Sequence, residues 1–467
     1  VTVDDFTLTL NEDGQSYSVT DYDFYENKYS EIVVPDSFNG LPVTTIARHA
    51  FSYSYYFVSV TIPDSVTRIE DYAFSDCYDL ETIIIGNSAI EFGASVFDCC
   101  SNFKEFVVSE TNPVYSSEDG LLLSKDKSTL VIYPFGKEDV IFTIPEYIST
   151  IATDSIKHPV NLRLLVAGEN VKTVEKSAVN IIGAVTLPSK TITSFAANGN
   201  EALKVYFDGT EEDFENSFGA SFDELFNSEI DTYEIVYGLP LSTGETEDYY
   251  YLVTPENEIE IVGYKNKTQN LVVPSEINGK PVTSIGAGAF GNVDYLTGNG
   301  YIANAEESLL TVTLPDTVEH ISVYGFAGNT LLRTIGLPNS ILSIGAAAFA
   351  YCGELSVQLP YGLKKLGYLS FYYTKYVGLA ETIEKLSLYS VYSFYVSLPH
   401  NVSGYSEFSV CAFEYGKLYF NGTQSKLNTL VENNQVGYDS AYNELSFSLP
   451  KKLGDNGEFS YILNSDN

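Results

Sequence analysis

The chain has 467 residues, of which 44% are hydrophobic, so it can bury a large core and exceeds the size that one compact core usually organises. Its 62 acidic and 25 basic residues give a net charge of −37. A field of this sign repels phosphate backbones and anionic lipid surfaces, which excludes nucleic acid as an expected partner. No stretch approaches the ~18 consecutive apolar residues of a membrane-spanning helix, so we also expect no membrane insertion.

The first predicted element is a capping hairpin that includes the acidic stretch DYDFYEN, residues 21–27. This stretch lacks the Gly and the closing Glu of a calcium-binding loop, so we expect no calcium site there. A longer segment follows and occurs twice. EIVVPDSFNGLPVTTIARHAF (31–51) and NLVVPSEINGKPVTSIGAGAF (270–290) share 11 of 21 positions at an offset of 239. The chain therefore contains an internal duplication.

A shorter repeat follows each copy. TLP and GLP end at Pro315 and Pro338, a step of 23 residues, and the step after them is 22. In TIPDSVTRIEDYAFSDCYDLETIII (61–85) the final Leu-x-x-Ile-x-Ile alternates as a short strand does, and the Pro or Gly that follows ends the strand. We therefore expect a solenoid of short parallel strands, built from coils of about 23 residues.

An Ala-Phe pair marks many of these coils. It recurs as Ala50-Phe51, Ala73-Phe74, Ala289-Phe290, Ala348-Phe349 and Ala412-Phe413. One coil cannot bury its own apolar edge, so neighbouring coils must stack and share a core. Because the phenylalanines follow the repeat, we interpret them as core residues rather than ligand contacts. Residues 146–200 and 361–397 keep the apolar rhythm but lose the pair, which leaves coil boundaries there undefined.

The repeat resembles the BspA-type leucine-rich repeat of bacterial surface proteins, whose unit runs approximately Ile-Pro-x-x-Val-x-x-Ile-x-x-x-Ala-Phe-x-x-Cys-x-x-Leu-x-x-Ile. Residues 61–85 match this unit nearly throughout. Further similar segments are NPVYSSEDGLLLSKDKSTLVIYP (112–134), NGKPVTSI (278–285), VYFDGTEED (205–213) and LYFNGT (418–423). The resemblance implies a curved, right-handed leucine-rich-repeat solenoid.

The duplication divides the chain. VYFDGT is followed by DFENSFGASFDELF (213–226), which reads as a short amphipathic helix, and then by GLPLSTGETED (238–248), which reads as a linker. The opening pattern then restarts. We therefore predict two tandem solenoid segments, residues 1–237 and 238–467, each with its own capping regions.

The cysteines follow the spacing of the repeat. Cys77 and Cys352 each follow the phenylalanine of a coil by three residues, and Cys99 follows Phe97 by two. These positions face the predicted core, so we expect buried thiols rather than a disulfide framework. The adjacent Cys99 and Cys100 cannot easily both point inward. With no CxxC and no Cys/His cluster, structural zinc is not expected.

The sequence offers little for catalysis. Its four histidines, at positions 49, 158, 320 and 400, lie in different coils, and HExxH, Gly-x-Ser-x-Gly and Gly-Lys-Ser/Thr are absent. Gly286-Ala-Gly-Ala-Phe-Gly291 fits G-x-G-x-x-G, but its Ala-Phe is the repeat's own core pair. A carboxylate pair for glycoside hydrolysis could arise among the 62 acidic residues. We expect no catalytic, cofactor-binding or metal-binding residue, and hence no enzyme.

Tyrosine supplies the candidates for ligand binding. The chain has 37 tyrosines, and each gives contact area together with a hydroxyl group, which suits protein or sugar recognition. The alternative is that they pack between coils. The predicted strand face carries mostly small hydroxylated residues, and aromatic residues join it only in late coils. We therefore predict ligand contacts at Tyr372, Tyr373, Tyr392 and Tyr395, or at the coil corner with Tyr53, Tyr55 and Tyr56.

Two functions from different classes remain open. The resemblance implies a cell-surface or secreted recognition and adhesion protein that binds an extracellular or host-surface protein. The tyrosines and carboxylates instead favour a carbohydrate-binding module, or less strongly a glycan-acting enzyme that recognises polysaccharide. In either case we expect an extracellular or cell-surface monomer from which a signal peptide has been removed.

Overall fold

The computed structural model describes residues 3–23, 29–88, 90–157, 159–175, 177–181, 183–188, 203–218, 233–266, 268–292, 309–380, 385–387, 389–399, 410–433, 436–437, 444–447, 452–455 and 460–463. The chain divides into two compact units. Unit 1 contains the described residues up to 181, and unit 2 contains residues 183–187, 203–215 and the described residues from 233 onward. The predicted segments 1–237 and 238–467 remain a prediction.

Unit 1 begins with a cap. The 3-10 helix η1 (Val3–Asp5) leads into strand β1 (Phe6–Leu10), which pairs antiparallel with β2 (Tyr17–Tyr22). From β2 onward the pairing becomes parallel, because each coil adds one strand to the strand of the coil before it. The cap therefore covers the first open edge of the solenoid, which would otherwise expose unpaired backbone groups.

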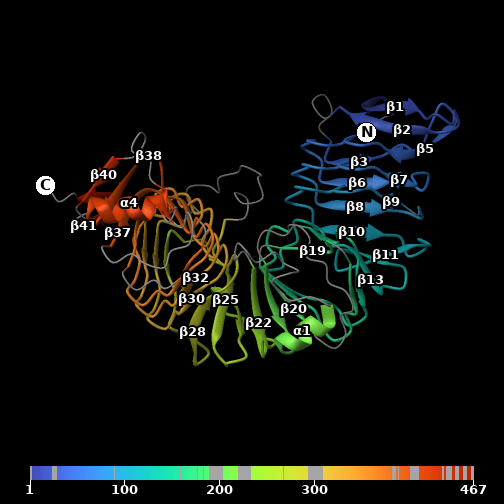
Figure 1. Cartoon of the computed structure of the whole chain (residues 1–467). Coiled ribbons are helices and arrows are strands. Elements are labelled where there is room, and N and C mark those ends of the chain that lie inside the picture. Colours follow the sequence, from blue (N-terminus) through green and yellow to red (C-terminus); the bar gives the residue numbers. More distant parts are fainter. Residues whose placement is uncertain are drawn as a thin grey trace. The chain divides into compact units, whose positions relative to one another are not determined.

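Two parallel ladders run through the first half of unit 1 (Figure 1). One ladder consists of β3 (Glu31–Val33), β6 (Ser59–Ile62), β8 (Thr82–Ile85) and β10 (Glu105–Val108). The other consists of β5 (Leu41–Ile46), β7 (Arg68–Ile69) and β9 (Glu91–Phe92), with β4 (Ser37–Phe38) paired to β5. Ser59 pairs with Thr82 and Arg68 with Glu91, a step of 23 residues in both ladders. The predicted parallel-strand solenoid is confirmed.

The second half of unit 1 departs from this pattern through a hairpin. Strands β11 (Tyr115–Glu118), β12 (Leu121–Ser124) and β13 (Thr129–Ile132) pair antiparallel, and β13 then pairs parallel with β15 (Thr150–Ile151). The coils that follow keep the step of 23 residues between Thr150 and Thr173. Their strands are β14 (Ile141–Thr143), β16 (Ile156–Lys157), β17 (Leu164–Val166), β18 (Thr173–Val174) and β19 (Val179–Asn180).

Unit 2 repeats the architecture. The antiparallel strands β23 (Ser242–Glu245), β24 (Tyr249–Val253) and β25 (Ile259–Tyr264) form its hairpin cap, and β25 pairs parallel with β28. One ladder runs through β28 (Lys280–Ile285), β30 (His320–Ile321), β32 (Ser343–Ile344), β34 (Lys365–Leu366) and β36 (Lys385–Leu386), with β27 (Glu276–Ile277) beside β28. The other side of the coils carries β26 (Asn270–Val272), β29 (Thr311–Thr313), β31 (Thr334–Gly336) and β33 (Ser356–Gln358).

The remaining elements of unit 2 lie before and after this stack. Before it, β20 (Gly183–Leu187), β21 (Leu203–Phe207) and β22 (Tyr233–Tyr237) are parallel, and helix α1 (Glu211–Phe218) follows β21. After it come β35 (Phe371–Gly378), β37 (Val391–Leu398), β38 (Val410–Phe420), helix α4 (Gln424–Glu432), β39 (Val436–Gly437), β40 (Glu444–Ser446), β41 (Lys452–Asp455) and β42 (Ser460–Leu463). The predicted helix 213–226 is thus observed only as α1, because residues 219–226 lie outside the described part.

The linker predicted at 238–248 is wrong in part, because strand β23 runs through it. Its pairing with β24 places Gly244 opposite Tyr251. A Cβ on Gly244 would lie 2.5 Å from the Tyr251 hydroxyl oxygen, so glycine is required there to let the ring lie across the strand. The Gly and Thr of this segment therefore serve a close contact in a cap.

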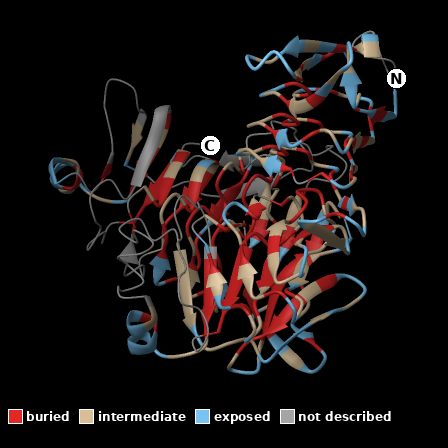
Figure 2. Ribbon diagram, turned by 90° about the vertical axis from the view of Figure 1, so that its right-hand side faces the viewer, coloured by how far each residue is buried: buried red, intermediate tan, exposed pale blue. Residues whose placement is uncertain are grey.

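The Ala-Phe pairs form the core, as predicted. In unit 1 the rings of Phe51 and Phe74 stack with their centroids 4.8 Å apart. In unit 2, Phe326, which follows Gly325 in a variant of the pair, stacks on Phe349 at 5.4 Å, and all four side chains are fully buried. Burying a phenylalanine contributes roughly 1.5–3 kcal/mol, and Figure 2 shows buried residues running along the stacked strands. Ala412-Phe413 lies outside the residues whose side chains are described.

A row of small polar residues follows these rings. The thiol of Cys77 donates to the Phe51 carbonyl of the preceding coil at 3.0 Å, and that of Cys352 donates to the Phe326 carbonyl at 3.3 Å. These two are buried free thiols, as predicted. In the third coil Cys100 fills this position, whereas Cys99 is partly exposed. The prediction that placed Cys99 in the core is therefore wrong, because the inward position lies three residues after the phenylalanine.

Candidate functional site

The predicted tyrosines of the late coils belong to a row of aromatic rings in unit 2. The ring centroid of Tyr372 lies 5.7 Å from that of Tyr392, and that of Tyr373 lies 5.3 Å from that of Phe394. Tyr351 contacts both Tyr372, at 5.3 Å, and Tyr373, at 6.3 Å. We call these five rings the aromatic row. Tyr351 was missed by sequence reasoning, although it holds the same repeat position as Tyr373, two residues after the phenylalanine of its coil.

The backbone explains why some of these rings project from the coil. Tyr351 and Tyr373 have φ angles of 61° and 57°, in the left-handed region. An L-residue pays roughly 1–2 kcal/mol for this conformation. In the same coils Ala348-Phe349 and Ser370-Phe371 turn inward, so the left-handed residue must point away from the core. The same conformation recurs at Tyr72, Asp76 and Cys99 in the turns of unit 1, so it belongs to the repeat and directs these side chains away from the core.

Tyr395 lies apart from the aromatic row, although it was predicted with it. It pairs in register with Tyr376 on one side and Lys417 on the other, along the strand ladder of unit 2. Its side chain is 37% exposed. The neighbouring Tyr376 is buried and donates its hydroxyl to Ser397 Oγ at 2.7 Å. Ser397, expected on the open strand face, is therefore buried, because a larger residue covers it.

The second predicted group lies in unit 1. Tyr55 stacks on Tyr78 with ring centroids 5.7 Å apart, which supports the alternative that such rings pack between coils. Tyr53 and Tyr56 are about half exposed, at 56% and 49%. The backbone N–H of Tyr56 donates to Asp79 Oδ2 at 3.0 Å. Tyr53 and Tyr56 thus expose part of their rings at this corner, whereas Tyr55 packs against the next coil.

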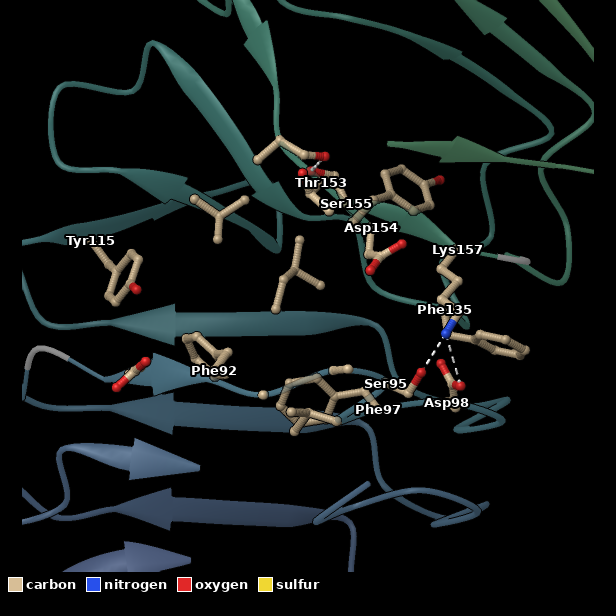
Figure 3. A pocket seen from close by; sticks show the side chains of 18 residues that line it. Phe92, Ser95, Phe97, Asp98, Tyr115, Phe135, Thr153, Asp154, Ser155 and Lys157 are labelled. Atoms are coloured by element: carbon tan, nitrogen blue, oxygen red, sulfur yellow. Dashed lines mark hydrogen bonds and ion pairs between the residues drawn. The ribbon is translucent and has the colours of Figure 1, made fainter. Parts of the chain in front are cut away.

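Unit 1 also contains an open cavity that the sequence did not predict (Figure 3). It has a volume of about 540 Å³. One wall is formed by residues 91–98 and the other by residues 152–157, while Tyr115, Val131, Ile132, Tyr133 and Phe135 form its floor. We call it the turn slot, because its two walls are turns of the solenoid.

One ion pair crosses the turn slot. Lys157 Nζ lies 3.1 Å from Asp98 Oδ2 and also donates to Ser95 Oγ. Figure 3 shows this bridge at one side of the opening, with Tyr115 and Phe92 at the other. The side chains of Lys157 and Asp98 are each about one-third exposed, so water screens their attraction.

A second cavity, of about 760 Å³, lies in unit 2. Lys204 of β21 forms a close ion pair at 2.5 Å with Glu260 of β25, and its Nζ lies 3.9 Å from Glu234 of β22. Lys204 also donates to Ser322 Oγ at 3.4 Å. Its side chain is 8% exposed and that of Glu260 is 2% exposed. We call this group, together with Tyr206, the buried lysine cluster.

The buried lysine cluster strongly perturbs its titrating groups. Burial is the largest single effect and lowers the pKa of Lys204, but the charges of Glu260, Tyr206 and Glu234 together outweigh it, so the pKa lies above its usual value. For Tyr206, burial and then the Glu260 charge raise the pKa well above its usual value. Within the described residues, Glu260 Oε1 and Tyr206 Oη have no hydrogen-bond partner of regular geometry. Such groups are costly in a stable interior and common in ligand sites.

The cavity of unit 2 is lined by several glutamates and by His320, which are residue types that bind metal ions. Among the described residues, no group of three or more His, Cys, Asp and Glu side chains is arranged to hold a metal ion. Of the four histidines, His49 stacks on Tyr72 at 5.3 Å and His320 Nδ1 lies 2.8 Å from Ser343 Oγ. His158 and His400 lie outside the described part. In the portion of the chain searched, no helix is long and apolar enough to span a bilayer.

Comparison with protein families gives one result. The family model of the BspA type leucine rich repeat region matches residues 17–122, 264–375 and 299–418, in six copies. These ranges include the doubled segment and the coils with Ala-Phe pairs. The resemblance predicted from the sequence is confirmed. A comparison with curated proteins gives no match.

Comparison with solved structures gives several leucine-rich repeat proteins. A leucine rich cell surface protein from Faecalibacterium prausnitzii A2-165 is 19% identical, over 94% of this chain and 98% of that chain, with a TM-score of 0.35. The pneumococcal vaccine antigen PcpA is 15% identical, over 95% and 96%, with a TM-score of 0.35. A leucine-rich repeat protein from Bacteroides ovatus ATCC 8483 is 15% identical, over 90% and 99%, with a TM-score of 0.27.

Proposed function

The chain belongs to the BspA-type leucine-rich repeat family, and from this premise we propose that it is a non-enzymatic recognition and adhesion protein of the bacterial surface or exterior. Its partner would be an extracellular or host-surface protein. Solenoid coils display a continuous surface on a rigid core, which suits such binding. The chain itself would act as a monomer.

The aromatic row is the observation that supports this proposal most strongly. Tyr351 of one coil contacts both Tyr372 and Tyr373 of the next coil, and Tyr373 is 44% exposed. Tyrosines held in place lose little conformational entropy on binding, and such rings are enriched where proteins bind proteins. The net charge of −37 favours a partner with a basic surface.

The test measures binding of the whole chain to immobilised extracellular proteins and polysaccharides at two salt concentrations. A basic protein partner predicts binding that weakens as salt is raised. The variant with Tyr372, Tyr373, Tyr392 and Tyr395 changed to Ala should lose at least tenfold in affinity. Tyr361→Ala is the matched control, because Tyr361 is exposed in the same unit and lies outside the row. Equal binding by the fourfold variant would exclude the aromatic row as the contact surface.

The buried lysine cluster favours a second candidate, the binding of a polysaccharide. A sugar hydroxyl both donates and accepts, so it could pair with Glu260 Oε1 and with Tyr206 Oη without adding a charge beside Lys204. Glu234 and Glu260 line the same cavity, which is why a glycan-acting enzyme stays a weaker alternative. Salt-independent binding of a polysaccharide that Glu260→Gln abolishes would favour this candidate. Release of reducing ends would favour the enzyme.

A further inference from the structure

The turns that carry the Ala-Phe pairs are joined by a regular set of backbone hydrogen bonds. In the second coil the N–H groups of Tyr72, Phe74 and Asp76 donate to the carbonyls of residues 94, 96 and 98 in the next turn, at 3.1, 3.0 and 2.8 Å. The turn at Tyr324, Phe326 and Gly328 donates in the same way to residues 346, 348 and 350. Three alternate N–H groups of each turn thus point toward the following coil.

The turn at one wall of the turn slot has the same conformation but lacks these bonds. Ser95 and Cys99 have φ angles of 54° and 60°, matching the left-handed residues of the turns before. Among the described residues, the N–H groups of Ser95, Phe97 and Cys99 form no hydrogen bond, whereas their counterparts in neighbouring coils do. Ser95 and Phe97 line the turn slot, and Cys99 continues the same turn, so the three donors point toward the side on which the slot lies.

The missing acceptors have a definite cause. In the intervening coil this turn is replaced by Tyr133-Pro134-Phe135-Gly136, in which Tyr133 and Phe135 are buried. Its Tyr133 N–H donates to the Ser155 carbonyl at 2.8 Å, and its Gly136 N–H donates to the Phe103 carbonyl. This short turn forms the floor of the slot and leaves the space outside it empty.

The width of the slot follows from the stacking. Its walls belong to coils separated by one intervening coil, so they stand about two strand spacings apart, or roughly 10 Å. The extended side chain of Lys157 crosses this gap to reach Asp98 and Ser95. The empty space is thus about as thick as one extended polypeptide chain.

We propose that the turn slot binds an extended segment of a partner polypeptide, whose alternate carbonyls accept hydrogen bonds from the N–H groups of Ser95, Phe97 and Cys99. This deepens the proposed function and rests on it, because it gives protein recognition a defined site and mode. Addition of a strand to an open ladder is a known mode of peptide binding, in which the backbone supplies affinity and side-chain pockets supply specificity.

The lining defines the side chains that the segment should carry. Phe92 and Tyr115, whose ring centroids lie 5.9 Å apart, offer an apolar surface for one side chain, while Phe135 lies beside Lys157 at the other side of the slot. Glu91, Asp98 and Asp154 outnumber Lys157, so the slot favours a basic residue and disfavours an anion. The occupant is therefore an extended segment with an apolar residue close to a Lys or Arg.

The first experiment is hydrogen–deuterium exchange in the free protein. The amides of Ser95, Phe97 and Cys99 should exchange at least tenfold faster than those of Tyr72, Phe74 and Asp76, which are bonded in the previous turn. Equal protection of the two sets would overturn the proposal, because the slot would then already be closed.

The second experiment selects binders from phage-displayed random peptides of twelve residues on the whole chain. Thr153→Trp places a large ring in the slot wall, and Lys172→Trp is the control at an exposed position outside it. The selected peptides should bind Thr153→Trp at least tenfold more weakly than wild type, bind Lys172→Trp equally, and slow exchange at the three amides.

Absence of slot-dependent peptides, or equal binding by Thr153→Trp with an unchanged melting temperature, would overturn the proposal. These outcomes differ from failure of the proposed function. A protein partner whose capture depends on the aromatic row, and is unchanged in Thr153→Trp, would leave surface recognition standing and remove only the slot.

Discussion

The two cavities each contain a lysine paired with a carboxylate, yet they place the pair in opposite surroundings. In the turn slot, Lys157 and Asp98 are about one-third exposed, and backbone N–H groups are the donors that face the opening. In the buried lysine cluster, Lys204 and Glu260 are almost fully buried, and among the described residues Glu260 Oε1 and Tyr206 Oη have no hydrogen-bond partner. The same ion pair can thus bridge an open gap or form part of a core, depending on how much water reaches it.

The largest expected effect is the difference in stability loss when each of the two lysines is replaced. Lys204→Met leaves Glu260 buried without its cation, which should destabilise unit 2 by about 3–5 kcal/mol. Lys157→Met removes a pair that water already screens and should cost no more than about 1 kcal/mol. Urea unfolding followed by circular dichroism measures both.

A double variant distinguishes the loss of charge pairing from the loss of packing around Lys204. Lys204→Met combined with Glu260→Leu removes both charges, so most of the lost stability should return. If the double variant is as unstable as Lys204→Met alone, the loss reflects packing around the lysine stem rather than an unpaired carboxylate.

The tyrosines in the two cavities should ionise at different alkaline pH values. Burial and then the Glu260 charge raise the pKa of Tyr206 well above its usual value, whereas burial and then Glu91 raise that of Tyr115 in the slot. Absorbance at 295 nm should therefore show Tyr115 ionising at a lower pH than Tyr206, identified by Tyr115→Phe and Tyr206→Phe. The reverse order would mean that water reaches the buried lysine cluster.

The raised pKa values of two other buried tyrosines make the stability of the protein depend on pH. Burial is the main cause that raises the pKa of Tyr22 in unit 1 and of Tyr376 in unit 2 to about 12, whereas an unfolded tyrosine titrates near about 10. Between these values the folded state keeps protons that the unfolded state loses. The stabilising contribution is complete below about pH 10 and declines as the pH rises toward about 12. Urea midpoints measured from pH 8 to 12 should fall across this window, and a flat profile would contradict it.

The cysteines of unit 1 differ in exposure, and we therefore expect a smaller difference in their reactivity. Cys99 is partly exposed near the slot, while Cys77 and Cys100 are buried. Burial, with Asp76 and Asp98 close by, raises the pKa of Cys99 to about 11, so little thiolate exists at pH 8. Under native conditions a thiol reagent should label Cys99 before Cys77 and Cys100, and its rate should rise about tenfold from pH 8 to 9. Mass spectrometry of the labelled peptides measures this, and faster labelling of Cys100 would contradict the assignment of the inward position.

The features that could be predicted from the sequence are those that recur with the repeat period. Phe51 and Phe74 recur at a fixed step, so their stacking and the inward position of Cys77 follow from spacing alone. Lys204 and Glu260 lie 56 residues apart, off the period, and nothing in the local pattern pairs them. The turn slot was missed for a related reason, because it arises where Tyr133–Gly136 replaces a turn. The sequence marks such a place only by the absence of an Ala-Phe pair.

The smallest expected effect concerns the left-handed residues of the two regions. Asp154, with a φ of 55°, is exposed in the slot wall, and Tyr351, with a φ of 61°, belongs to the aromatic row. Glycine relieves roughly 1 kcal/mol of backbone strain at such a position, and its greater freedom in the unfolded chain offsets part of this gain. Asp154→Gly should therefore stabilise the protein by about 0.5 kcal/mol.

Tyr351→Gly relieves the same strain but also removes the ring contacts to Tyr372 and Tyr373. Such ring contacts are worth about 0.5–1.5 kcal/mol, so this variant should be neutral or destabilised in urea unfolding. If it gains as much as Asp154→Gly, the aromatic row contributes nothing to folding. Its tyrosines would then be kept at a glycine position for binding alone, which would strengthen the assignment of that surface to recognition.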